Sequence, residues 1–386
     1  MDITDWVLLF HGDLATKERL DAARNSRRIE ETPKQRLQFV VFLLGLFHFK
    51  MACADAIWRT YIKPQDHRLD LNSMFSHIGI LRPNETYKIG SKPTFRQLHD
   101  VIHHDIWASI LDCWRLEAQE RNPEWTSITK FAESESATWE AIVEMSESIV
   151  SKYVARTPSL KDLRRKTESE RDMMFENQIL RNRDELLYLE TSHAMSSGDI
   201  GRVEDTFLPW IYHFKSTGKH KYANHLQEFM TDLDSSHIIR MNLLCNPTGR
   251  PHGFRAIDWV VERNNLYTKV IFAGSGSTRT MEHIINESIL IELYRKCHVA
   301  IEDGFYLEHR TIRHQPPDMT ATVKKLGATI QEHRAHIFKK GRKADVCLPD
   351  QISVAMEIMM FDNTATLEDP GDSNEIEIEA DDLFDG

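Results

Sequence analysis

Two side chains in this sequence follow apolar runs at places where chemistry is common. Asp13 comes just after the apolar run from Trp6 to Phe10, and His48 follows a second run that ends at Leu44. In α/β sheets, side chains beyond the strand ends line the crevice used for ligands. A carboxylate there can hold a divalent cation, and a histidine can move a proton. The simpler alternatives are that Asp13 caps the next helix and that His48 is a satisfied, half-buried histidine.

A pair of acids near residue 260 extends this hypothesis. Asp258 and Glu262 are four residues apart in an expected helix over 256–268, so they share one helix face. Like charges this close repel unless a cation or a basic side chain lies between them. We therefore predict that Asp13, Asp258 and Glu262 are catalytic, or that the acid pair forms ion pairs with Arg255, Arg263 or Lys269.

The same hypothesis defines a metal site and its ion. The predicted ligands are Asp13, His48, Asp199 and Glu262, and the predicted ion is Mg²⁺, which carboxylates bind. Asp199 lies in a glycine-containing break after a long charged segment. Capping of the helix that follows would explain Asp199 without any metal.

A second group of residues is basic and predicts contact with DNA. Lys219 and Lys221 flank an expected helix start, where phosphate binding is favoured, although a solvated turn explains them equally well. Arg250 and Arg255 follow in a segment rich in proline and glycine. A contiguous face that collects these four side chains would support nucleic-acid binding, and their dispersal would count against it.

Charge and cysteine usage narrow the class of protein. The formal net charge is −11, but residues 362–386 hold ten acids and no Lys or Arg, which leaves 49 acids against 48 bases in the rest. This acidic end predicts a disordered tail. The five cysteines occur singly, as expected for free thiols in a reducing compartment. The sequence shows no signal peptide and no apolar stretch long enough to span a membrane, so we expect an intracellular protein, nuclear or cytoplasmic, without a membrane partner.

Hydrophobic periodicity predicts a mainly α fold with a small β-sheet. Strands are expected over residues 5–11 and 37–44, with a helix over 17–28 between them. Residues 63–92 read as a long connection. The remaining apolar periods predict helices over 49–61, 95–121, 136–154, 164–196, 203–214, 222–233, 256–268, 281–304 and 319–338.

These elements suggest one mainly helical domain over 1–338 with an N-terminal strand, helix and strand unit. A basic segment and a short element follow over 339–361, and the acidic tail occupies 362–386. Two strands alone do not make a stable sheet. Either further strands lie in ambiguous segments, or an N-terminal portion of the domain lies elsewhere.

Four blocks carry a resemblance to a known family. They are residues 45–58, 218–223, 245–249 and 265–269. Together they resemble a fungal family catalogued as domain of unknown function six-five-eight-nine, over most of the chain from about Gly12 to about Asp318. The order of strand, acid, helix, strand, histidine and late helical acid is similar to a diverged, mobile-element-derived transposase of the ribonuclease H-like type.

That resemblance implies roles for particular residues. Asp13 would match the acid of the sheet, Glu262 or Asp258 the helical acid, and residues 59–242 an insertion. The chain departs from the transposase pattern because it has no upstream strands with a first acid. Two functions follow: metal-dependent DNA cleavage or strand transfer, or a non-catalytic helical scaffold that binds nucleic acid or protein.

Overall fold

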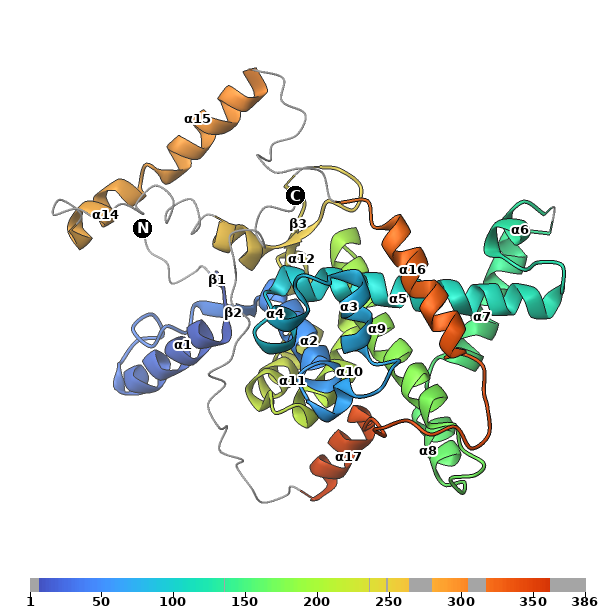
Figure 1. Ribbon diagram of the computed structural model, residues 1–386. Helices are drawn as coiled ribbons and strands as arrows, with labels where there is room; N and C mark the ends of the chain where they lie inside the picture. Colours follow the sequence, from blue (N-terminus) through green and yellow to red (C-terminus); the bar gives the residue numbers. More distant parts are fainter. Residues whose placement is uncertain are drawn as a thin grey trace.

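The computed structural model describes residues 7–134, 136–235, 237–247, 249–263, 280–304 and 317–361. It is mainly helical with two small two-stranded sheets, which confirms the predicted fold class. A large body of packed helices lies beside the strand, helix and strand unit, and α14 (Met281–Ser288) and α15 (Ile291–Gly304) extend away from that body (Figure 1). The predicted acidic tail lies outside the described residues.

The N-terminal unit has the predicted order of strand, helix and strand. β1 (Leu8–Gly12) and β2 (Val40–Leu44) are parallel, and α1 (Leu14–Ser26) connects them. Gly12 pairs with Leu44, so both strands end at the same edge. β2 is almost entirely buried, whereas Leu8 and Phe10 of β1 are largely exposed. β2 therefore joins the unit to the helical body, and its end positions the candidate site.

The core of the body forms around four helices. These are α2 (Leu46–Tyr61), α5 (Phe95–Arg121), α9 (Met173–Ser197) and α10 (Ile200–Ser216). α2 packs against the other three and is buried along nearly all its length. Its small residues Ala52, Cys53 and Ala56 are fully enclosed, which lets the neighbouring helices approach closely. α5 begins with a capping box, in which Thr94 and Gln97 satisfy each other's backbone N–H groups.

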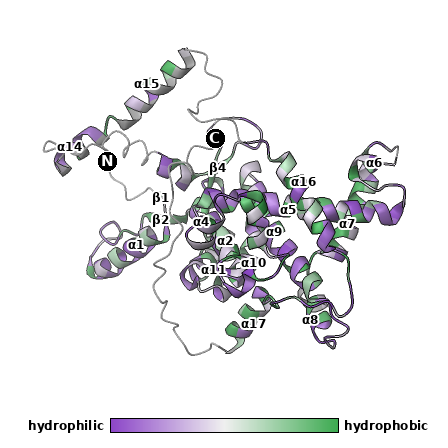
Figure 2. Cartoon of the chain, in the orientation of Figure 1, coloured by the Kyte–Doolittle hydropathy of each residue, from purple (hydrophilic) through white to green (hydrophobic). Residues whose placement is uncertain are grey.

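Shorter elements surround this core. They are the 3₁₀ turns η1 (Arg27–Ile29) and η2 (Asp66–Arg68), and the helices α3 (Met74–Leu81), α4 (Thr86–Ser91), α6 (Ile128–Ala132), α7 (Trp139–Tyr153), α8 (Thr157–Arg164), α11 (His220–Ser235), α12 (His237–Met241), α16 (Thr320–His333) and α17 (Gln351–Phe361). α17 is mainly hydrophobic, whereas α5 and α7 carry both hydrophilic and hydrophobic positions (Figure 2). Among the described residues, no helix combines the length and apolarity that crossing a membrane requires.

The structure differs from the predicted elements in three main places. Residues 63–92 are not a plain connection, because they contain η2, α3 and α4. The helix predicted from residue 164 begins at Met173, since Asp172 caps it there and accepts from the N–H of Phe175. A short antiparallel pair, β3 (Leu244–Cys245) with β4 (Arg255–Ala256), was not predicted. It leads directly into helical turns over residues 257–263.

Candidate functional site

The N-terminus of α2 is capped by a side chain from a distant part of the chain. Gly45 ends β2 and has no side chain to cap α2. Both carboxylate oxygens of Asp258 accept from the N–H of Phe47 at 3.1 Å, and Oδ2 also accepts from the N–H of His48 at 3.1 Å. A negative charge at a helix N-terminus satisfies its unpaired N–H groups and its dipole. Asp258, only 2 % exposed, therefore fixes the turns of 257–263 onto the end of β2.

His48 forms a dyad with the same carboxylate. Its Nδ1 lies 2.9 Å from Oδ2 of Asp258. Burial lowers the pKa of the His48 imidazole, but the hydrogen bond to Asp258 and the charge of Asp258 outweigh burial, so the pKa is raised above its ordinary value. Its other nitrogen, Nε2, has no hydrogen-bond partner among the described residues. Asp258 thus orients the ring through Nδ1, and Nε2 is the nitrogen that can bind a ligand or exchange a proton.

Asp13 and Glu262 complete what we call the strand-end cluster, defined as Asp13, His48, Asp258 and Glu262. Asp13 follows Gly12, which pairs with Leu44 at the strand edge, and Glu262 lies one helical turn after Asp258. The charges of Glu262 and Asp13 both raise the pKa of His48. Asp13 also caps α1, with Oδ1 accepting from the N–H of Thr16 at 2.7 Å. Glu262 is half-buried and forms no ion pair within the described part of the chain. Three separate segments therefore bring their charged groups to one strand edge.

The structure assigns Asp199 to a helix cap and gives Asp258 a partner other than the arginine and lysine side chains considered from the sequence. Asp199 does not join this cluster: it caps α10 and accepts from the N–H of Arg202 at 3.2 Å. Among the described residues, Asp258 pairs with His48 and not with Arg255 or Arg263, and the third alternative partner, Lys269, lies outside the described residues. No three His, Cys, Asp or Glu side chains of the described ranges are arranged so that they could hold a metal ion. Asp13 and Asp258 instead satisfy the ends of α1 and α2.

Gly45 offers a direct test of this arrangement. A Cβ atom at Gly45 would lie 2.7 Å from Cγ of Asp258 and 2.9 Å from the carbonyl oxygen of Gly12. We expect Gly45→Ala to push Asp258 off α2 and to lower the free energy of unfolding by about 2 kcal/mol, measured by urea unfolding. Gly79→Ala in α3 is the control, since a Cβ atom at Gly79 meets no atom within 4 Å. Equal losses in the two variants would contradict the prediction.

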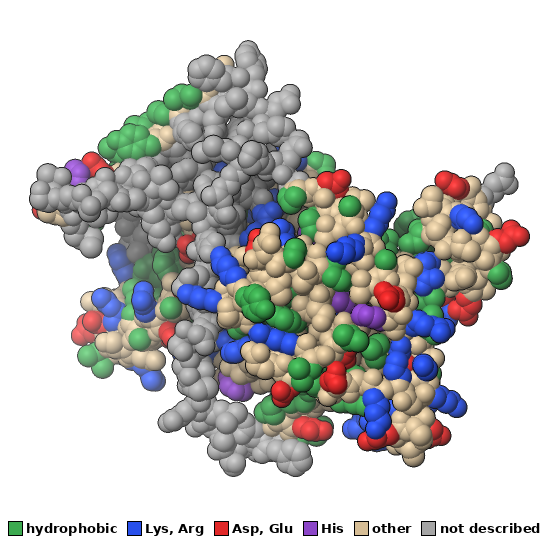
Figure 3. Space-filling view, viewed as in Figure 1, with side chains coloured by type: hydrophobic (Ala, Val, Ile, Leu, Met, Phe, Trp, Pro, Cys, Tyr) green, Lys and Arg blue, Asp and Glu red, His purple; other side chains and the backbone are tan. Residues whose placement is uncertain are grey.

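The four predicted DNA-binding residues do not form one surface patch. Lys219 is buried and forms an ion pair with Asp55 at 2.8 Å. Lys221 is about half exposed and pairs with Glu18 at 2.9 Å, whereas Arg250 lies in an exposed turn. Lys and Arg side chains are scattered over the face seen in Figure 3, with acidic side chains between them. Arg255 differs from these, because it lines a cavity beside the strand-end cluster.

A residue that sequence reasoning missed lines the same cavity. Lys50 lies on α2 one turn after Phe47, and both contribute to the cavity wall with Arg255 and Arg96. The sequence signal was present in the run from Phe47 to Met51, in which a lysine interrupts an otherwise apolar helix. A charged residue on a buried helix is a stronger indication of function than an exposed basic turn.

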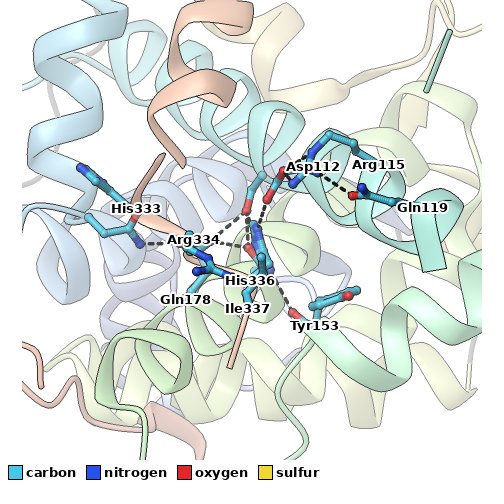
Figure 4. Close-up of polar contacts among 12 residues, drawn as sticks. Asp112, Arg115, Gln119, Tyr153, Gln178, His333, Arg334, His336 and Ile337 are labelled. Carbon is cyan, nitrogen blue, oxygen red and sulfur yellow. Dashed lines mark hydrogen bonds and ion pairs between the residues drawn. The ribbon is translucent and has the colours of Figure 1, made fainter. Parts of the chain in front are cut away.

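A second histidine cluster resembles a nucleophilic triad but is enclosed. Nδ1 of His336 lies 2.9 Å from Asp112, and Nε2 lies 3.1 Å from Oγ of Ser109. Figure 4 shows His336 at the centre of these contacts, close to Tyr153. Ser109 is fully buried within α5 and also donates to Asn182 at 2.7 Å. Because Ser109 bonds to His336 and Asn182 inside the body, this cluster fastens the segment after α16 to α5 and α9.

The comparisons with known proteins give a family but no activity. No curated protein and no solved structure matches the chain. Residues 2–314 match the family described as "Family of unknown function (DUF6589)". The match includes β1, β2, the four core helices α2, α5, α9 and α10, and the whole strand-end cluster, and it ends before α16. Because it covers most of the sequence, the chain belongs to the DUF6589 family.

Proposed function

We propose that the chain performs metal-dependent phosphodiester chemistry on DNA, cleavage or strand transfer, at the strand-end cluster. The supporting observation is the convergence of Asp13, the His48–Asp258 dyad and Glu262 at the ends of two parallel strands. Carboxylates gathered at such an edge are the groups that this chemistry uses. The similarity of the element order to a mobile-element transposase agrees with the proposal.

The dyad supplies a group that can move a proton. Asp258 holds Nδ1 of His48, so Nε2 is the atom that accepts or donates a proton at the reacting phosphate. Against the effect of burial, the hydrogen bond and charge of Asp258, with smaller contributions from Glu262 and Asp13, raise the pKa of the His48 imidazole. In its protonated state His48 suits the role of an acid that protonates a leaving oxygen.

Asp13 and Glu262 are the residues that would hold a Mg²⁺ ion. Mg²⁺ keeps several of its waters and often takes only one or two protein carboxylates, so it does not require a cluster of three side chains. Glu262 lacks an ion-pair partner among the described residues. Asp13 would turn one carboxylate oxygen away from Thr16. When bound, the ion would supply a positive charge that stabilises the attacking and leaving oxygens.

A plasmid-nicking assay tests this proposal. We expect the wild-type chain to nick supercoiled DNA in Mg²⁺ or Mn²⁺ and not in EDTA. Glu262→Gln and His48→Gln should each lower the rate by about a hundredfold or more, because each removes a group that acts at the reacting phosphate. Asp13→Asn should do the same while it keeps the cap of α1, since asparagine caps as well as aspartate.

Glu124→Gln is the matched control, because Glu124 is exposed and lies in the turn after α5. It should nick at the wild-type rate. Nicking that is equal in the wild type and in Glu262→Gln, or absent from the wild type, would reject the catalytic proposal. DNA binding without nicking would then favour the second candidate, a non-catalytic helical scaffold that binds nucleic acid.

A further inference from the structure

A cavity of about 290 Å³ lies next to the strand-end cluster, and we call it the basic cavity. Its walls come from α2, α5, α9 and the segment that contains β4. The residues that matter for its chemistry are Lys50, Arg96, Arg255, Phe47, Phe95 and Trp259. Its volume is close to the lower end of the range for small-ligand sites, about 300 Å³. Phe47 and Trp259 also adjoin the dyad residues His48 and Asp258, so the two sites share one helix junction.

The lining of the basic cavity carries three cationic side chains and no carboxylate. Nζ of Lys50 contacts Oγ of Ser192 at 3.5 Å and lies 5.6 Å from the centre of the Phe95 ring. Neither Lys50 nor Arg255 forms an ion pair with an acid among the described residues. Burial, together with the charges of Arg255 and Arg96, lowers the pKa of Lys50 to about 8.

Other buried cations of this protein are compensated. Lys219 pairs with Asp55, and Arg181 lies beside Asp105. Burying Lys50 without an acidic partner therefore lowers the stability of the fold, a loss that the ion pairs of the other two cations prevent. An uncompensated cation in a concave site indicates an anionic ligand, which would supply the missing charge.

The aromatic side of the basic cavity indicates what the anion is attached to. The Phe47 and Phe95 rings meet edge to face at 5.4 Å, and Arg255 lies over the Trp259 ring at 5.9 Å. Flat apolar walls beside positive charge suit a nucleotide, whose base stacks on aromatic or guanidinium planes while its phosphate meets the cations. An acidic peptide would pair with the cationic side chains but would not stack on the aromatic walls.

We propose that the basic cavity binds one nucleotide of a single DNA strand, with its phosphate at Lys50 and Arg255 and its base against the aromatic wall. This inference rests on the proposed action on DNA and names the part of the substrate that is held. The strand would continue past Phe47 to His48, so the cavity would anchor the DNA next to the reacting phosphodiester.

Fluorescence anisotropy with a fluorescein-labelled single-stranded oligonucleotide tests the proposal, with EDTA present so that no cleavage occurs. Lys50→Met and Arg255→Met should each weaken binding about tenfold or more, because each loses a charge-assisted contact. Each should also reduce the slope of log affinity against log salt by about 0.7. Lys161→Met removes an exposed lysine of α8 and should bind like the wild type.

Competition identifies the chemistry of the ligand. A nucleoside 5′-monophosphate should displace the oligonucleotide at a concentration at least tenfold lower than inorganic phosphate, because only the nucleotide reaches the aromatic wall. Equal competition by inorganic phosphate, or stronger competition by polyglutamate, would overturn the assignment to a nucleotide.

Two further readouts separate folding and catalysis from binding. Lys50→Met should leave the circular dichroism spectrum unchanged and should not lower Tm, because it removes an uncompensated buried charge. Glu262→Gln should bind the oligonucleotide like the wild type. If oligonucleotide binding depends on Lys50 but the chain never nicks DNA, the assignment of the cavity stands and the catalytic proposal is rejected. If the wild type nicks DNA and Lys50→Met binds the oligonucleotide as tightly as the wild type, only the assignment of the cavity is rejected.

Discussion

Arg181→Met is expected to lower the free energy of unfolding by about 3 to 5 kcal/mol, because it leaves buried acids without their cation. Arg181 lies in α9 and is 3 % exposed. Its guanidinium donates to the carbonyl oxygen of Asn72 at 2.7 Å and to Gln178 at 2.8 Å, and its Nε lies 3.4 Å from Asp105. The charges of His77 and Arg181 hold the pKa of Asp105 well below its usual range, against the effect of burial.

The consequences of this substitution extend to a second acid. Burial raises the pKa of Glu185 well above its ordinary value, and the charge of Asp105 raises it further, so Glu185 holds a proton. Burial lowers the pKa of His77 and the charge of Arg181 lowers it further, so without Arg181 the neighbouring His77 recovers only part of the lost charge. Urea unfolding followed by circular dichroism measures the loss. Arg165→Met is the control, because Arg165 and its partner Asp162 are 69 % and 71 % exposed and such pairs contribute at most about 1 kcal/mol. A loss below 1 kcal/mol for Arg181→Met would contradict the expectation.

The second large effect is expected at Asp258. Asp258→Ala removes the cap of α2 and the partner of His48 together, and we expect a loss of about 3 kcal/mol or more in the free energy of unfolding. Asp258→Asn keeps an oxygen that can accept from the N–H of Phe47, so it should lose about half as much. The strand-end cluster is thus expected to depend on one carboxylate for its shape.

The loss in Asp258→Asn should depend on pH in a defined direction. The pKa of His48 in the folded state is raised above 6.5, its ordinary value. The protonated His48 therefore contributes its full stabilisation below pH 6.5, and this contribution is lost as the pH rises through the folded-state pKa. Asp258→Asn should therefore be more destabilising at pH 5.5 than at pH 9. The measurement is urea unfolding of both chains at each pH, with Gly79→Ala as a variant whose effect should be independent of pH, because a Cβ atom at Gly79 meets no atom within 4 Å. A larger loss at pH 9 would contradict the assignment of the dyad.

Much of the fold could be predicted because hydrophobic periodicity is strong where elements are long or fully buried. α5 was predicted with its observed limits, Phe95–Arg121, since its apolar positions recur over many turns and Thr94 caps it. β2 was recognised from its continuous apolar run. Residues 63–92 were misread because α3 and α4 have only 8 and 6 residues, too few for a period to stand out from turns.

The candidate site was predicted in part because strand ends have a known geometry. Asp13, His48, Asp258 and Glu262 were named from the sequence, and they lie together in the structure. Their pairing was not predictable: nothing local indicates that Asp258 reaches the N–H groups of α2 across 211 residues. The burial of Lys219 was not predictable either, because only the folded structure shows its ion pair with Asp55 inside the helical body.

The capping of α2 by Asp258 has a consequence for biosynthesis. The two ends of this bond are 211 residues apart in the sequence. A ribosome must have released residue 258 before the first strands acquire their final neighbour. A nascent chain therefore cannot complete the strand-end cluster until most of its length has been translated.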